Sequence, residues 1–173
     1  ASHKSKILAQ KLRKMTPFLS VPTEVVEDFK VLNTKSEILD IYLMMSQLKY
    51  DTCLDFGDLE GYVPILGGME PVFKFRENRY NQGAKNRAIC TTTGPYTQCM
   101  LRKNDMNKFQ SNIERLNLDY TGKWLIFSDS DDRVMFNDFT NQDAPNSVLV
   151  KSKIVADTQR LQFDRFYQNL EKF

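Results

Sequence analysis

The sequence has little of the material that common catalytic sites need. It contains one histidine, three cysteines and seven glycines among 173 residues. The glycine patterns GxxxxGK(S/T) and GxGxxG, which bind phosphates in two large nucleotide-binding classes, are both missing. With His3 as the one imidazole, a serine or cysteine nucleophile would lack its usual base. We therefore expect a protein that is not an enzyme, with no catalytic residues, no metal site and no cofactor.

Long apolar runs and a strong net charge are also missing. No run approaches the roughly 18 apolar residues that cross a bilayer. The 24 basic and 22 acidic residues nearly cancel, to a formal charge of +2, which argues against nucleic-acid binding through bulk charge. Hydrophobic residues make up 41% and charged residues 27% of the chain, as in ordinary globular domains. These values exclude a disordered chain and favour a single soluble domain.

The three cysteines are odd in number and show no CxxC spacing. Such a count favours free thiols and a reducing compartment over a secreted disulfide framework. Cys90 and Cys99 flank the pair Gly94-Pro95 and could face each other across a hairpin, so one disulfide stays possible.

Positive charge is concentrated at the N-terminus. Residues 1–23 contain five bases and no acid, whereas the other 150 residues hold 19 bases and 22 acids. A basic segment on a mildly acidic body is typical of binding to a partner or to a membrane surface. A solvated helix end explains the same pattern equally well. The candidate partner-binding residues are Lys4, Lys6, Lys11, Arg13 and Lys14.

The hydrophobic pattern changes its period near residue 48. Thr34 and Glu37 form a capping-box pattern ahead of apolar residues at helical spacing, which predicts a helix over 35–48. We expect an N-terminal helical segment over 1–48 and a mixed α/β domain over 49–173. In the first segment, the expected helices besides 35–48 cover 4–15 and 23–32. In the second, we expect strands at 50–56, 62–66, 69–75, 88–93, 96–103, 124–127, 133–136 and 148–155, loops at 76–87 and 137–146, and helices at 106–116 and 163–170.

This order predicts an α/β (α+β) fold with a mixed sheet and flanking helices. Two clusters could carry function. Asp129, Asp131 and Asp132 could hold a divalent cation for hydrolysis, although aspartates also suit a tight turn between strands. The basic and aromatic stretch 76–87 could bind single-stranded nucleic acid, although an ordinary exposed loop explains it more simply.

The run Cys53-Leu54-Asp55-Phe56-Gly57, with two short strands expected after it, resembles the first hairpin of the actin-like (ribonuclease H-like) ATPase fold. The run Ile89–Tyr96, the segment Gln98–Arg102 and the helix expected from Met106 extend the resemblance to the actin-like assembly proteins of type IV pili and type II secretion. Within them, the chain is most similar to the cytoplasmic domain of an inner-membrane component of the type IVb, bundle-forming pilus. Asp58 and Glu60 stand where nucleotide-binding members have a phosphate-binding turn, and acidic groups there would repel a triphosphate.

The resemblance implies a partial actin-like subdomain, preceded by N-terminal helices, that has lost nucleotide binding. It implies a non-catalytic scaffold at the cytoplasmic face of the bacterial inner membrane. The implied partners are the pilus assembly ATPase and other inner-membrane platform proteins, without nucleic acid, and the implied membrane tether follows residue 173. The alternative is a small nucleic-acid-binding or regulatory module that uses residues 76–87 and the basic N-terminus.

Overall fold

The computed structural model describes residues 28–47, 51–105, 111–116, 118, 120–128 and 130–170. The elements in these ranges, in chain order, are β1 (Asp28–Leu32), α2 (Lys35–Ser46), β2 (Thr52–Gly57), α3 (Tyr62–Ile65), α4 (Met69–Asn81), β3 (Lys85–Cys90), α5 (Pro95–Asp105), β4 (Ser111–Arg115), β5 (Gly122–Ile126), β6 (Arg133–Asp138), β7 (Asn146–Lys151) and α6 (Lys153–Leu170).

The strands form one seven-stranded mixed sheet in the order β1-β7-β6-β5-β2-β3-β4. β2, β3 and β4 run parallel to one another. α3 and α4 connect β2 to β3, and α5 lies in the connection from β3 to β4. The pairs β2–β5, β5–β6, β6–β7 and β1–β7 are antiparallel. The expected α/β (α+β) class, with a mixed sheet and flanking helices, is therefore confirmed.

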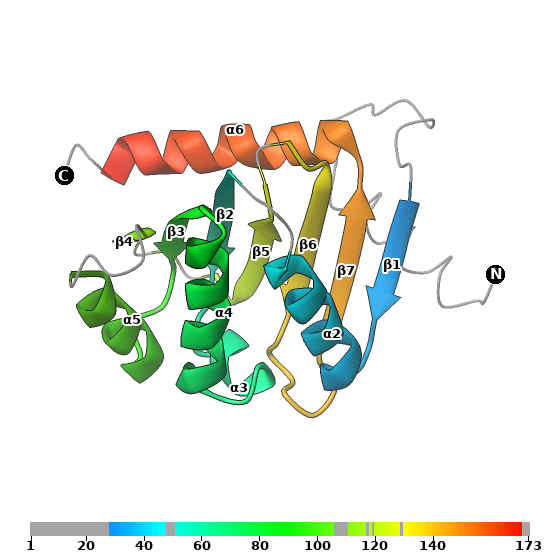
Figure 1. Cartoon of the computed structure of the whole chain (residues 1–173), viewed down its shortest axis with the longest axis horizontal. Coiled ribbons are helices and arrows are strands. Elements are labelled where there is room, and N and C mark those ends of the chain that lie inside the picture. The colour runs from blue at the N-terminus through cyan, green and yellow to red at the C-terminus, as the bar shows by residue number, and fades with distance from the viewer. Residues whose placement is uncertain are drawn as a thin grey trace.

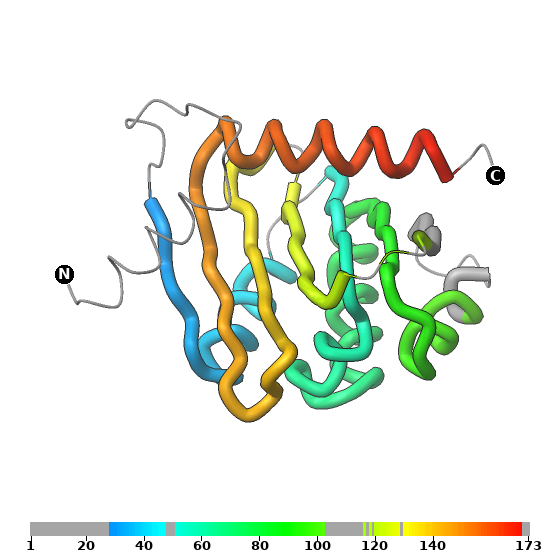
Figure 2. The backbone as a smooth tube through the Cα atoms, turned by 180° about the vertical axis from the view of Figure 1, so that it is seen from behind, coloured from blue at the N-terminus to red at the C-terminus, as the bar shows by residue number. Residues whose placement is uncertain are grey.

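Helices cover the two faces of the sheet unequally. α2, α3, α4 and α5 lie over one face, and the long helix α6 crosses the other (Figures 1 and 2). Successive residues of a strand point to opposite faces, so β2 contributes to both layers. Leu54 and Phe56 join the core under α6, whereas Cys53 and Asp55 face the four-helix side.

The helix predicted at 35–48 is confirmed as α2. The Thr34 hydroxyl accepts a hydrogen bond from the Glu37 amide (3.2 Å), and the Glu37 carboxylate accepts one from the Thr34 amide (3.1 Å). This reciprocal arrangement is the predicted capping box, and it satisfies amides that the first helical turn leaves without partners. The strands predicted at 50–56, 124–127 and 133–136 and the closing helix are also present, as β2, β5, β6 and α6.

The strands predicted at 62–66 and 69–75 are wrong: these residues form α3 and the start of α4. Pro64 and Pro71 indicated strand ends, but each is the third residue of a helix. An amide there has no partner within the helix, so proline costs no hydrogen bond at that position. The two strands that the actin-like resemblance expects after Gly57 are therefore helices.

Two further predictions around the next segment are wrong for related reasons. The expected loop at 76–87 is the second half of α4, a short turn and the start of β3. The expected second hairpin strand at 96–103 lies in α5, which begins at Pro95. Proline is favoured as the first residue of a helix, because its fixed φ suits the helix and its missing N–H is not needed there.

The helices predicted at 23–32 and 106–116 are contradicted where the structure describes them. Residues 28–32 form β1, an antiparallel partner of β7, and residues 111–115 form β4, a parallel partner of β3. Apolar residues three or four apart suggested helices, but pairing with a neighbouring strand outweighs such a local pattern. The strand predicted at 148–155 ends at Lys151, because Ser152 caps α6 by accepting a hydrogen bond from the Val155 amide. The loop predicted at 137–146 covers residues 139–145, since β6 continues to Asp138 and β7 begins at Asn146.

The predicted N-terminal helix at 4–15 lies outside the described residues. Because β1 pairs with β7, part of the segment 1–48 belongs to the same sheet as the rest of the chain. Among the helices of the described ranges, none is both long enough and apolar enough to cross a bilayer.

Candidate functional site

The acidic turn between β5 and β6 is used for ion pairs inside the domain. Asp131 binds the guanidinium of Arg133, whose Nε lies 2.9 Å from both carboxylate oxygens. Burial raises the pKa of Asp131, but the hydrogen bonds from Arg133 outweigh it and hold the pKa below its ordinary value. Asp132 lies 3.9 Å from the guanidinium of Arg160. Asp129, the third residue of the predicted cluster, lies outside the described residues.

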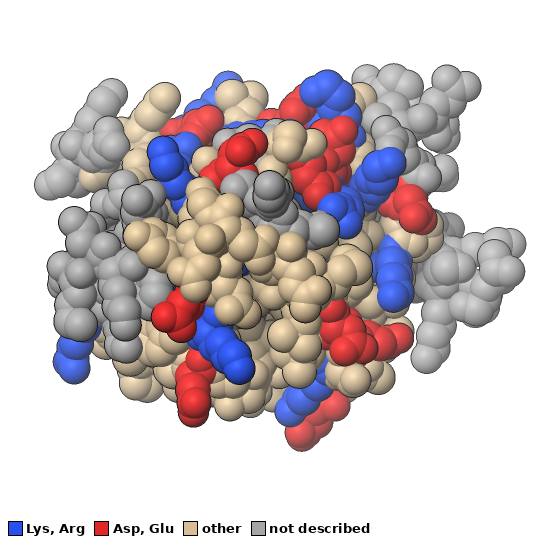
Figure 3. Space-filling model, viewed as in Figure 1, with Lys and Arg blue, Asp and Glu red and all other residues tan. Residues whose placement is uncertain are grey.

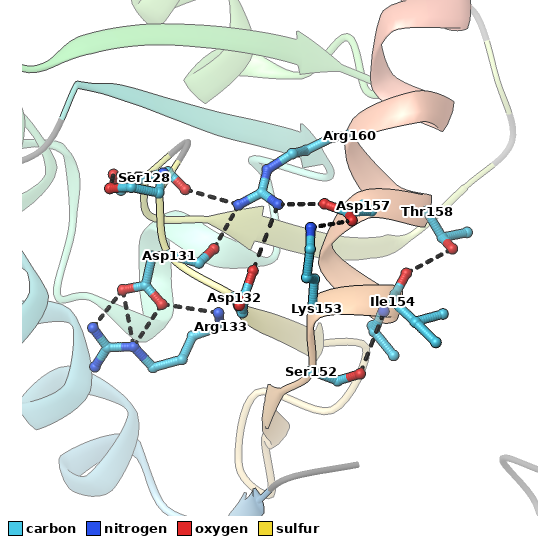
Figure 4. Close-up of polar contacts among 12 residues, drawn as sticks. Ser128, Asp131, Asp132, Arg133, Ser152, Lys153, Ile154, Asp157, Thr158 and Arg160 are labelled. Atoms are coloured by element: carbon cyan, nitrogen blue, oxygen red, sulfur yellow. Dashed lines mark hydrogen bonds and ion pairs between the residues drawn. The ribbon is translucent and has the colours of Figure 1, made fainter. Parts of the chain in front are cut away.

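Arg160 joins this turn to α6 (Figure 4). Its Nη2 donates to the backbone oxygens of Ser128 (3.1 Å) and Asp131 (2.6 Å), and its Nη1 pairs with Asp157 on the same helix (2.9 Å). Asp157 also binds Lys153 at 2.7 Å. In the described part of the chain, no group of three His, Cys, Asp or Glu side chains could hold a metal ion. The described residues of the turn form a structural clamp between the β5–β6 connection and α6.

The basic stretch 76–87 does not form an exposed nucleic-acid-binding loop. Arg79 is buried, with its guanidinium 5.5 Å from the centre of the Phe75 ring. Arg76 is partly buried and donates to the sulfur of Met100. Arg87 points to the opposite face of the sheet, where it stacks on Tyr167 of α6 (4.4 Å). On the four-helix side, the acidic and basic residues that the structure describes are interspersed (Figure 3).

The carboxyl ends of β2 and β3 mark the place where open α/β sheets commonly bind ligands. Here a carboxylate of the chain itself occupies the N-terminus of α5. Glu60 accepts hydrogen bonds from the amides of Tyr96 (3.3 Å) and Thr97 (2.9 Å), and from the Thr97 hydroxyl (2.9 Å). Asp58 accepts hydrogen bonds from the amides of Glu60 and Gly61. Both acids, singled out in the sequence as unfavourable to a triphosphate, therefore satisfy backbone donors that an anionic ligand would otherwise use.

Two glycines make this edge possible. Gly57 has a φ of +125°, and a Cβ there would lie 2.2 Å from the backbone oxygen of Gly122. A Cβ on Gly94 would lie 2.3 Å from the carboxyl carbon of Glu60. Alanine at either position would displace a neighbour. The close approach of Gly57 to Gly122 and that of Gly94 to Glu60 therefore each depend on a glycine.

Deeper in the same layer lies a buried ion pair between Lys123 of β5 and Asp55 of β2. The Lys123 side chain is 1% exposed and that of Asp55 is 16% exposed. The ammonium also lies 4.4 Å from the centre of the Tyr62 ring. Burial raises the pKa of Tyr62 above its ordinary value, Asp55 raises it further, and Arg76 and Arg79 act in the opposite direction. Among the described residues, Asp55, Arg76 and Arg79 therefore act on the Tyr62 hydroxyl, and Lys123 lies against the ring.

The sequence analysis did not single out Asp55 as part of an ion pair, and it did not select Lys123 at all. The alternation in β2 placed Asp55 on the same side as Cys53, and Lys123 precedes the apolar run of β5. The available signal for an interior ion pair was a charged residue within an apolar strand pattern, Asp55 in β2 or Lys123 in β5. Its partner could not be found, because it lies 68 positions away and depends on β5 pairing with β2.

The three cysteines are free thiols. Cys53 and Cys90 are buried, and Cys99 is partly exposed. Burial raises the pKa of the Cys90 thiol to about 12. The hairpin that could have brought Cys90 and Cys99 together is replaced by β3 followed by α5.

The predicted partner-binding residues Lys4, Lys6, Lys11, Arg13 and Lys14 all lie outside the described residues. Their role in binding a partner stays a prediction.

No family model and no curated protein matches the chain. The fold itself is a known one. The chain is similar to TrmBL2, an archaeal chromatin protein with a novel mode of DNA binding, at 16% identity and a TM-score of 0.56. The likeness covers 96% of this chain and 61% of TrmBL2, so the chain spans about three fifths of that protein.

Two other solved structures share the fold. NucT from Helicobacter pylori is 11% identical, with a TM-score of 0.55, and the likeness covers 84% of this chain and 97% of NucT. Polyphosphate kinase from Porphyromonas gingivalis is 10% identical, with a TM-score of 0.54, and 92% of this chain covers 28% of the kinase. At these identities the likeness concerns the fold alone, and none of the three is named as a pilus assembly protein.

Proposed function

We propose that the chain is a non-catalytic regulatory domain of a DNA-associated protein. The observation that carries this proposal is the internal use of charge at the carboxyl edge of the parallel strands. Glu60 binds the first amides of α5, and Asp55 binds Lys123, so these groups serve the fold instead of a reacting substrate. Catalysis uses acids, bases or hydrogen-bond donors that are aimed at the reacting atoms of a bound substrate.

The likeness to TrmBL2 supports the association with DNA. It extends over nearly the whole of this chain but leaves about two fifths of the chromatin protein outside. These coverages fit a domain that accompanies a separate DNA-binding part of the same protein. The buried Arg79 and the stacked Arg87 fit it as well, because neither guanidinium is presented to a phosphate backbone.

Crosslinking in cells tests the association. The natural protein is crosslinked with formaldehyde and immunoprecipitated, and we expect DNA to be recovered with it. The isolated 173-residue chain is expected to show no salt-sensitive binding to duplex or single-stranded DNA in fluorescence anisotropy. Recovery of a pilus ATPase in place of DNA would overturn the proposal and favour the pilus platform.

An assay for phosphodiester hydrolysis tests the absence of catalysis. The chain is incubated with single-stranded DNA and with a chromogenic phosphodiester, with and without Mg²⁺. We expect no hydrolysis above the rate of a matched preparation of Lys123→Met. Turnover by the unmodified chain that this substitution abolishes would show that Lys123 takes part in chemistry, and the domain would be an enzyme.

The pilus-platform function, with its ATPase partner and its location at the inner membrane, stays a prediction. No feature of the described residues favours it over the regulatory proposal. Binding of the purified chain to the pilus assembly ATPase remains its direct test.

A further inference from the structure

The strand β1 lies at one edge of the sheet, and within the described ranges its one neighbour is β7 (Figure 1). The helix α6 begins at Lys153, directly after β7, and runs over β6 and β2 to β4, away from β1. A strand at a sheet edge presents backbone N–H and C=O groups that can pair with a strand of another chain. The first three residues of β1, Asp28, Phe29 and Lys30, are all exposed.

A row of apolar side chains across the sheet ends at this edge. On the side that α6 covers, the residues that stand opposite one another on β5, β6, β7 and β1 are Ile126, Val134, Val150 and Phe29. The first three are at most 8% exposed, whereas Phe29 is 49% exposed. Apolar and aromatic side chains that stand opposite each other on neighbouring strands stabilise a sheet. The row therefore favours a further strand that places an apolar residue opposite Phe29.

Two charged residues flank Phe29 on β1. Asp28 and Lys30 point to the other side of the sheet, because side chains alternate along a strand. Among the described residues, neither has an ion-pair partner within 4.0 Å. Lys30 lies within electrostatic range of Glu37 on α2 without forming an ion pair. The exposed end of β1 therefore offers a carboxylate and an ammonium, two residues apart, to a neighbouring strand.

This order of charges is complementary to itself in one register. When a second copy of β1 runs antiparallel with Phe29 opposite Phe29, Asp28 of each copy stands opposite Lys30 of the other. The two pairs of opposite charge and the aromatic pair all stabilise the sheet. A shift of the register by two residues, in either direction, places Lys30 opposite Lys30 or Asp28 opposite Asp28, and like charges directly opposite each other are destabilising.

We propose that the chain forms a symmetric dimer in which β1 pairs antiparallel with β1 of a second copy, so that two seven-stranded sheets join edge to edge. Each copy uses the same strand in the same register, and the two-fold axis passes between the two Phe29 side chains. A five-residue strand makes a small interface, so we expect a reversible dimer with a dissociation constant in the micromolar range. This inference goes beyond the proposed function and does not depend on it.

Sedimentation velocity of the 173-residue chain tests the dimer. The average mass should rise from one chain toward two between about 1 and about 200 µM, a range that spans a micromolar dissociation constant. Hydrogen exchange at the same two concentrations locates the contact, because pairing should slow the exchange of β1 amides. A chain that stays monomeric, or a dimer whose β1 amides exchange as fast as in the monomer, would overturn the proposal.

Charge reversal in β1 tests the register. Asp28→Lys and Lys30→Asp each create two like-charge pairs, so each variant alone should dimerise at least about tenfold more weakly than the unmodified chain. In an equal mixture, the two positive side chains of one variant stand opposite the two negative side chains of the other. The mixture should therefore form a heterodimer as stable as the unmodified dimer, and a mixture that stays monomeric would refute the register.

Charge reversals outside β1 are the matched controls. Asp40→Lys and Lys35→Glu change exposed residues of α2 and should leave the dissociation constant within about twofold. If a β1 variant does not fold, as judged by circular dichroism, hydrogen exchange of the unmodified chain decides the question. Recovery of DNA by crosslinking does not require this pairing, so failure of the dimer and failure of the proposed function are distinguishable.

Discussion

Replacing Asp55 with asparagine tests how charge is balanced inside the domain. The substitution leaves Lys123 buried without the carboxylate that it contacts. Breaking a buried ion pair from one side costs about 3 to 5 kcal/mol, and Asp55 is slightly exposed, so we take about 3 kcal/mol for Asp55→Asn. For a chain of this length, that loss lowers Tm by about 6 to 12 °C.

The opposite substitution should cost less. Lys123→Met leaves Asp55 buried, but Arg76 still lies near enough to stabilise its charge. We expect a loss of about 1 kcal/mol, which is small for removal of one partner of a buried pair. Urea unfolding followed by circular dichroism measures both values, with an unchanged m-value as the condition for comparing them.

The asymmetry between the two variants is the decisive result. A Lys123→Met variant as unstable as Asp55→Asn would show that Arg76 does not compensate for the lost lysine, and this reasoning would be refuted. Asp164→Asn, at a half-exposed residue paired with Arg87, serves as the surface control and should stay within about 0.5 kcal/mol of the unmodified chain.

Three other outcomes are expected. Gly94→Ala displaces the Glu60 carboxylate from the amides of α5 and should lower the free energy of unfolding by about 1 to 2 kcal/mol in urea titrations. Arg160→Ala removes the side-chain donor to the Asp131 oxygen and one of the two donors to the Ser128 oxygen, and it should cost about 1 to 3 kcal/mol, measured in the same way. Iodoacetamide at pH 8.5 should label Cys99 and not Cys90 in peptide mass spectrometry, since the raised pKa keeps the buried thiol protonated.

Each of these outcomes has a control. A Cβ at Gly83 has open space, and the positive φ of Gly83 gives Gly83→Ala a cost of its own. That cost should not respond to Glu60→Gln, whereas the cost of Gly94→Ala should shrink in that background. Arg165→Ala, at an exposed position of α6, should be nearly neutral. Equal labelling of Cys90 and Cys99 in the folded chain would contradict the burial of Cys90.

Local signals in the sequence were enough for some elements and misleading for others. The capping box of Thr34 and Glu37 is complete within four residues, so it could be predicted without the fold. Pro64 and Pro71 fit either a strand end or the first turn of a helix. The following residues Val72, Phe75 and Arg79, spaced as on one face of a helix, were the signal that decided between the two.

The polar interior was harder to predict than the elements. Stretch 76–87 has the composition of an exposed loop, yet Arg79 is buried because α4 packs the face that carries Val72 and Phe75 onto the core. The turn at Asp131 could be understood as a turn, but its clamp on α6 needs Arg160, which lies 29 positions later. Pairings of this kind depend on the order of strands in the sheet, which local patterns do not determine.

The position of α6 has a consequence for synthesis of the protein. This helix follows every strand of the sheet in the chain, yet it provides Phe163 and Tyr167, which cover Leu54, Phe56 and Trp124. A nascent chain that has completed all of its described strands therefore still exposes an aromatic surface to solvent until the last helix leaves the ribosome. Partly synthesised chains of this protein should depend on chaperones, because exposed apolar sheet surfaces associate with one another.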